Sequence, residues 1–84
     1  MTPEEVLESL IAIVAEEGQV EPAQIGFGPG SLRDLGLSSL THLRILVAIE
    51  DAFGIEWDDN VDETILSDLH AMRDHLVGLL GAHA

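Results

Sequence analysis

The sequence contains no cysteine and no lysine among its 84 residues. Without cysteine, the chain can form neither a disulfide nor a cysteine-based zinc site. The N-terminus has no basic region followed by an apolar run, so we expect no signal peptide. No apolar run reaches the length that spans a bilayer. We therefore expect one domain over residues 1–84, soluble and cytoplasmic, with a core near the lower size limit for independent folding.

Positive charge is also scarce. Three arginines face sixteen carboxylates, which gives a formal net charge of −13. Such a charge repels phosphate backbones and anionic lipids, so we expect neither a nucleic-acid nor a membrane partner. It favours encounters with basic protein surfaces, although an acidic surface that serves only solubility would look the same. We expect a monomer.

Apolar residues recur at helical spacing in three long segments. They predict helices over residues 3–17, 39–53 and 68–80, with a short helix at 61–66. A long connection, residues 18–38, joins the first two helices, and such a length in so small a domain indicates a function. The predicted fold class is all-α: a four-helix bundle with three main helices, one short third helix and a long first loop.

Residues typical of helix ends mark the limits of these segments. Thr2 and Glu5 form a capping-box pattern, and Gly18 is expected to end the first helix. Ser67 is expected to cap the last helix, with Asp68 in its first turn.

The helix at 39–53 is apolar around much of its circumference. A helical wheel places Ile45, Ile49 and Phe53 toward the core, with Leu46 and Ala52 beside them. The opposite side holds the candidate docking residues Leu40, Leu43, Arg44, Val47 and Asp51. Leu40 and Val47 are expected to be partly exposed, as in a docking face. The alternative is that neighbouring elements cover this side.

A glycine turn followed by two serines opens this helix. The segment reads Leu35-Gly36-Leu37-Ser38-Ser39-Leu40, and the helix closes with Glu50-Asp51-Ala52-Phe53-Gly54-Ile55. A serine at a helix start is ordinarily a cap. This pattern, together with Thr64-Ile65-x-x-Asp68-Leu69, resembles the acyl and peptidyl carrier proteins, whose motifs are Leu-Gly-x-Asp-Ser-Leu and Gly-Gly-(His/Asp)-Ser-(Leu/Ile). By position, the resemblance assigns the attachment serine to Ser39 and not to Ser38.

The resemblance implies a cofactor, partners and a role. A phosphopantetheinyl transferase would use Mg²⁺ and coenzyme A, and the Ser39 hydroxyl would attack the β-phosphate. The resulting 4′-phosphopantetheine arm carries acyl or aminoacyl groups as thioesters between loading enzymes, synthases and transferases. The implied setting is fatty-acid, polyketide, antibiotic or other secondary-metabolite biosynthesis. A carrier needs no catalytic apparatus, and we expect no enzyme activity.

The chain also departs from the family pattern. Ser38 stands where the family has Asp or His, and Thr41 and Arg44 stand where acyl carriers of fatty-acid synthesis typically have acids. This start of the second helix is more like that of peptidyl or specialised carriers.

Four interpretations follow from these observations. The leading one is a free-standing acyl carrier modified at Ser39, and the second is a peptidyl or aminoacyl carrier. The third is an unmodified helical docking module in which Ser39 is only a cap. The fourth is a carrier-like protein that has lost modification.

The remaining polar and aromatic candidates are expected to be structural. His42 follows Ser39 closely but falls on the core side of the helical wheel, so we predict a partly buried packing residue and no dyad. His70 and Asp74 are spaced four apart with His75 adjacent, yet no third ligand shares their face, and we predict no metal site. Trp57 is expected to anchor the core.

Overall fold

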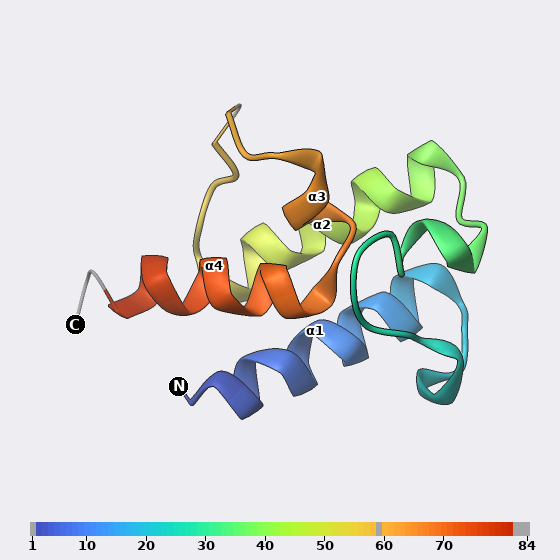
Figure 1. The fold of residues 1–84 in the computed structure, drawn as a ribbon, viewed down its shortest axis with the longest axis horizontal. Helices are drawn as coiled ribbons and strands as arrows, with labels where there is room; N and C mark the ends of the chain where they lie inside the picture. The colour runs from blue at the N-terminus through green and yellow to red at the C-terminus, as the bar shows by residue number, and fades with distance from the viewer. Residues whose placement is uncertain (1, 59, 82–84) are drawn as a thin grey trace.

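The computed structural model describes residues 2–58 and 60–81, and they form a helical bundle (Figure 1). The elements are α1 (Pro3–Gly18), η1 (Pro22–Gln24), η2 (Arg33–Leu35), α2 (Ser39–Phe53), α3 (Glu63–Leu66) and α4 (Leu69–Gly81). No strand occurs within the described residues. The predicted fold, with three main helices, a short third helix and a long first loop, is confirmed. None of these helices, over the ranges described, is long and apolar enough to cross a membrane.

The core lies where α1 packs against both α2 and α4. Each main helix contributes its buried apolar stripe, and the first loop adds two side chains. The buried apolar residues are Val6, Leu10, Val14, Ile25, Leu32, Ile45, Ile49, Leu69, Met72 and Leu76. Ile45 and Ile49 confirm the predicted inner face of α2, whereas Ala52, expected beside that face, is exposed. The fold therefore holds α2 by one side and leaves its opposite side open.

The two ends of α1 show which capping predictions hold. Thr2 and Glu5 form the predicted capping box, with Thr2 Oγ1 accepting from the Glu5 N–H at 3.2 Å. The helix continues through Gly18, and Gln19 takes the left-handed conformation (φ 54°) that ends it. Leu37 lies close to Gly18: a Cβ atom at residue 18 would be 3.3 Å from Leu37 Cδ2, a tight approach. The glycine thus allows the end of the first loop to pack on its beginning.

The start of α4 corrects a second capping prediction. Asp68 Oδ1 accepts from the N–H groups of His70 (3.0 Å) and Ala71 (3.4 Å), so Asp68 caps the helix. Ser67 is buried instead, and its hydroxyl donates to the Glu63 carbonyl at 3.0 Å. The prediction chose the wrong one of two adjacent capping residues, because Ser67 is the C-cap of α3 and its side chain turns back to the Glu63 carbonyl of that helix.

The first loop is held against the bundle by buried side chains and by hydrogen bonds to the α3–α4 junction. Ile25 and Leu32 are buried, and the Leu32 N–H donates to the Ser67 carbonyl at 3.0 Å. Phe27 is 47% exposed, and its ring stacks on that of His70 in α4 with centroids 4.6 Å apart. These contacts hold the loop beside the α3–α4 junction and thereby fix the position at which α2 begins.

Candidate functional site

The two adjacent serines at the start of α2 have different roles. Ser38 is the cap: its Oγ accepts from the Thr41 N–H at 3.1 Å and donates to Thr41 Oγ1 at 3.0 Å. The Ser38 carbonyl accepts the N–H of His42 at 3.0 Å. The hypothesis that Ser39 is only a cap is therefore wrong, because Ser38 occupies that position.

Ser39 is the first residue of α2 and is exposed. Its hydroxyl makes no hydrogen bond with any residue in the described part of the chain. Gly36, in the left-handed conformation (φ 71°), turns the chain just before it. The fold thus presents a free hydroxyl at a helix start, where backbone N–H groups and the helix dipole favour an anion.

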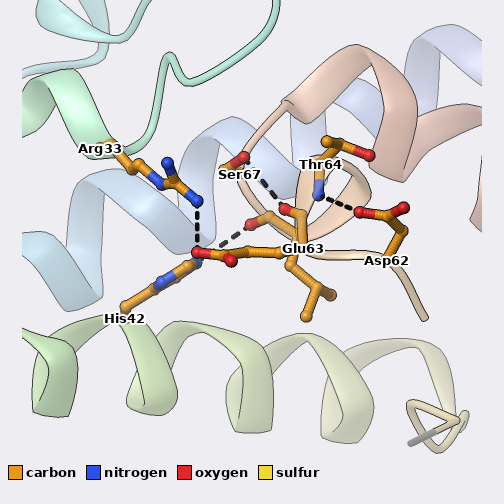
Figure 2. Close-up of polar contacts among 7 residues, drawn as sticks. Arg33, His42, Asp62, Glu63, Thr64 and Ser67 are labelled. Atoms are coloured by element: carbon orange, nitrogen blue, oxygen red, sulfur yellow. Dashed lines mark hydrogen bonds and ion pairs between the residues drawn. The ribbon is translucent and has the colours of Figure 1, made fainter. Parts of the chain in front are cut away.

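Beside Ser39 lies a hollow of about 190 Å³. It is lined by residues from the loop, α2 and α3: Leu32, Arg33, Leu37, Ser38, Ser39, His42 and Glu63. An ion pair between the Arg33 guanidinium and the Glu63 carboxylate joins the loop to α3 (Figure 2). The hollow therefore combines the free hydroxyl with one permanent cation and one carboxylate.

His42 is half-buried, as predicted, and its ring points from α2 toward α3 (Figure 2). Its Nε2 atom lies 3.0 Å from the Leu66 carbonyl oxygen. A carbonyl can only accept, so Nε2 carries the proton and donates it there. Nε2 is therefore not available as a base for Ser39, and the geometry shows a packing residue that joins two helices.

Sequence reasoning did not identify Arg33 and Glu63 as part of this site. Arg33 had a signal, since it is one of three arginines in the chain and directly precedes the Asp34-Leu35-Gly36 turn. No signal in the sequence pointed to Glu63, because it lies 30 residues after Arg33 and only the folded chain brings the two side chains together.

Asp62, beside this site, caps α3. The Thr64 N–H donates to Asp62 Oδ1 at 3.0 Å, and this bond holds the pKa of the Asp62 carboxyl below its ordinary value. The pKa of Glu5 is lowered in the same way by the Thr2 N–H, which donates to Glu5 Oε1 at 3.0 Å. Both carboxylates are exposed and charged at neutral pH.

The outer face of α2 is open to solvent. Leu40 is 59% exposed, Leu43 57% and Val47 47%, and Arg44 and Asp51 are also exposed. The predicted exposure is confirmed, and the alternative that other elements cover this side is wrong. A groove runs beside this face, lined by Glu17, Leu43, Arg44, Val47, Ala48 and Asp51.

The histidines of α4 each pair with an aromatic ring. His70 stacks on Phe27, and His75 stacks on Trp57 with ring centroids 5.9 Å apart. Asp74 pairs with Arg73 at 3.0 Å. Within residues 2–58 and 60–81, no three His, Asp or Glu side chains are grouped to hold a metal ion.

Trp57 joins α2 to α4. Its indole N–H donates to the Leu46 carbonyl at 3.0 Å, and its backbone N–H donates to Glu50 Oε2 at 2.9 Å. The side chain is half-buried against the core, which agrees with the predicted anchoring role.

A family model and several curated proteins are similar to this chain, and they point to the same family. The family described as "Phosphopantetheine attachment site" matches residues 8–69, a span that includes Ser39 and the whole hollow. The chain is 35% identical over 65 residues to the protein named acyl carrier protein of Prochlorococcus marinus, covering 77% of this chain and 81% of that one. It is 38% identical over 63 residues to the acyl carrier protein of Rhodopseudomonas palustris, covering 75% and 80%. With that of Cyanidioschyzon merolae it shares 34% identity over 65 residues, covering 77% and 71%.

Proposed function

This chain belongs to the family of phosphopantetheine-bearing carrier proteins, and we propose that Ser39 is the residue to which the 4′-phosphopantetheine arm is attached. The chain is a carrier and not an enzyme. Carriers of this kind interact with a phosphopantetheinyl transferase and with acyl-handling enzymes.

One observation carries the assignment to Ser39. Ser38 makes the cap bonds of α2, so the Ser39 hydroxyl is left exposed and free at the first position of the helix. A serine that must enter a transferase active site needs this freedom. It supports Ser39 over Ser38, whose oxygen is engaged with Thr41.

The residues around Ser39 suit a phosphodiester. The group would lie at the N-terminus of α2, beside the hollow that Arg33 lines. Ser39 Oγ becomes the ester oxygen and gives up its proton, while coenzyme A loses its nucleotide part as the leaving group. Once attached, the arm supplies a thiol that holds the cargo as a thioester.

We further propose that the cargo is an acyl group, in polyketide, fatty-acid or other secondary-metabolite biosynthesis. The relatives described above, which are named acyl carrier proteins, favour acyl over aminoacyl cargo. The peptidyl carrier remains the second candidate, supported by the Thr41 to Arg44 start of α2, which departs from fatty-acid carriers.

We also propose that partner enzymes dock on the outer face of α2. Leu40, Leu43 and Val47 form an exposed apolar strip on the same helix as Ser39. Arg44 and Asp51 place one positive and one negative charge beside it. Exposed apolar area bordered by charge is typical of a protein interaction surface.

The test of attachment is the intact mass of the protein after incubation with coenzyme A, Mg²⁺ and a broad-specificity phosphopantetheinyl transferase. Wild type is run beside Ser39→Ala and the matched control Ser38→Ala. We expect one added phosphopantetheine in wild type and in Ser38→Ala, and none in Ser39→Ala.

Two outcomes would contradict the proposal. Loss of modification in Ser38→Ala with retention in Ser39→Ala would move the attachment to Ser38. No addition to wild type, with the transferase active on a second carrier, would leave the outer face of α2 as the functional surface.

A further inference from the structure

Arg33 is held beside Ser39 by contacts on both sides of it. The preceding residue, Leu32, is buried and donates its N–H to the Ser67 carbonyl at 3.0 Å. The Arg33 carbonyl accepts the N–H of Gly36 at 3.0 Å, which closes the turn leading to α2. The backbone of Arg33 is therefore fixed to both the α3–α4 junction and the approach to Ser39.

The guanidinium of Arg33 has unused donors. Within the described residues its hydrogen-bond partner is Glu63, through one nitrogen, whereas a guanidinium has five N–H donors. Its side chain is 60% exposed and lines the same hollow as Ser39, so the remaining donors are open to solvent beside Ser39. Planar forked donors match the oxygens of a phosphate group.

The other nitrogen-bearing side chain at the hollow is already engaged. The Nε2–H of His42 donates to the Leu66 carbonyl at 3.0 Å, so this donor is not available to a group at Ser39. Arg33 is thus the one residue lining the hollow that combines a permanent charge with free donors.

We propose that Arg33 binds the phosphodiester formed at Ser39 and that Glu63 competes with this phosphodiester for the guanidinium. This inference rests on the proposed attachment at Ser39. Before modification, Arg33 pairs with Glu63 (Figure 2). After modification, two anions face one cation, and the arm is held by its phosphate end while its thiol end stays free to move.

Because the two anions compete for one guanidinium, removing the charge of Arg33 and removing that of Glu63 should have opposite effects on the binding of the phosphodiester. Removing the Arg33 charge deprives the phosphodiester of its partner. Removing the Glu63 charge frees Arg33 for the phosphodiester and takes away a neighbouring negative charge. A residue that served only the stability of the unmodified fold would not produce this opposition.

The experiment compares the modified and unmodified forms of four proteins: wild type, Arg33→Gln, Glu63→Gln and Arg73→Gln. Arg73 lies on α4, pairs with Asp74 and does not line the hollow, so its variant controls for the change in net charge. Intact mass first confirms that Ser39 is modified in each protein. Urea unfolding at low salt then gives the change in folding equilibrium constant caused by modification.

We expect this change to be less favourable in Arg33→Gln than in wild type, by up to about fivefold, the upper range for an exposed ion pair. It should be more favourable in Glu63→Gln and unchanged in Arg73→Gln. Equal effects of modification in wild type and Arg33→Gln would overturn the proposal, as would shifts of the same sign in Arg33→Gln and Glu63→Gln.

A second measurement does not depend on the variants. The ³¹P signal of the modified wild-type protein should move toward its position in the urea-unfolded modified protein as NaCl is raised to about 1 M, because salt screens the contact. A signal that does not move would overturn the proposal. Failure of Ser39 to take up the arm at all would count against the attachment site and not against Arg33.

Discussion

At the scale of the residue, Ser38 and Ser39 differ in what their oxygens contact. Ser38 Oγ accepts from the Thr41 N–H, while Ser39 Oγ makes no hydrogen bond with any residue that the structure describes. Substitution of Ser38 should therefore affect mainly the stability of the fold, and substitution of Ser39 should affect mainly the modification.

Ser38→Ala should lower the free energy of unfolding by about 1 kcal/mol, the usual cost of losing a helix cap. Ser39→Ala should change it by only a few tenths, because no hydrogen bond is lost and alanine favours helix. Urea unfolding of both variants in the unmodified form tests this. A larger loss in Ser39→Ala than in Ser38→Ala would mean that the cap is assigned to the wrong serine.

The lowered pKa of Asp62 predicts how the stability of the fold changes with pH. Its folded pKa lies below its ordinary value because the Thr64 N–H donates to the carboxylate. Its contribution to stability is thus fully present above the unfolded pKa of about 3.9 and is lost as pH falls through the lower folded pKa.

The matched variant for this effect is Asp62→Asn, which keeps a capping oxygen but does not titrate. The stability of wild type minus that of Asp62→Asn should decrease as pH falls from about 5 to about 2. Thermal melts across this range measure the difference. A difference that stays constant with pH would show that the carboxylate gains nothing from its cap bond.

Residue-level prediction from the sequence succeeded where one local pattern decides the structure. The Thr2–Glu5 capping box follows from spacing alone. Between Ser67 and Asp68 the sequence has two adequate caps, and the choice depends on the Glu63 carbonyl that engages the Ser67 hydroxyl. That information exists only after α3 has formed.

At the scale of the element, α2 presents one face to the core and the other to solvent. Arg44 places a positive charge on the outer face of a chain whose net charge is −13. Arg44→Glu should tighten binding to fatty-acid-type partner enzymes with basic docking surfaces by about fivefold, roughly one exposed ion pair.

A binding titration at low salt would measure this effect, with Arg44→Gln as the control that removes charge without reversing it. We expect Arg44→Gln to fall between wild type and Arg44→Glu. Unchanged or weaker affinity in Arg44→Glu would argue that the partners do not read charge at this position.

Trp57 supports a second prediction about elements, since it links α2 to α4. Trp57→Phe keeps an aromatic ring but loses the hydrogen bond to the Leu46 carbonyl. We expect the free energy of unfolding to fall by about 1 kcal/mol, and no more, because that carbonyl keeps its helical partner. Circular dichroism in urea measures this, and a variant as stable as wild type would assign the role of Trp57 to packing alone.

Helix limits were largely predictable, because amphipathic spacing and end residues are local properties. The predicted second helix, 39–53, coincides with α2, and its Gly54 takes the left-handed conformation that ends it. The hollow was not predictable, because Arg33 and Glu63 come from segments whose mutual position depends on Leu32 packing and on the turn of α3.

At the scale of the whole molecule, a net charge of −13 is confined within a radius of gyration of 11.8 Å. At about 10 mM salt the screening length is about 30 Å, so most carboxylate pairs repel, whereas at 0.15 M it is about 8 Å. We expect the Tm to rise by several degrees over this range, since about 1 kcal/mol shifts a domain of this size by about 4–8 °C.

NaCl and MgCl₂ at equal ionic strength separate screening from ion binding. Equal Tm values would indicate screening, and a higher Tm in MgCl₂ would indicate that carboxylates bind the divalent ion. A Tm that is flat against ionic strength would mean that the unfolded chain repels itself as strongly as the fold does.

Leu37, at the end of the first loop, lies close to Gly18 at its start, and this closeness affects how freely the loop can vary in length. The two ends of the loop lie close together, and the buried Ile25 and Leu32 hold the loop on either side of Pro29. For the flexible segment between these anchors, a doubling of length costs only about 0.6 kcal/mol of chain entropy. Insertions near the exposed Pro29 should therefore leave Ser39 in place, and loops of many lengths could present the same serine.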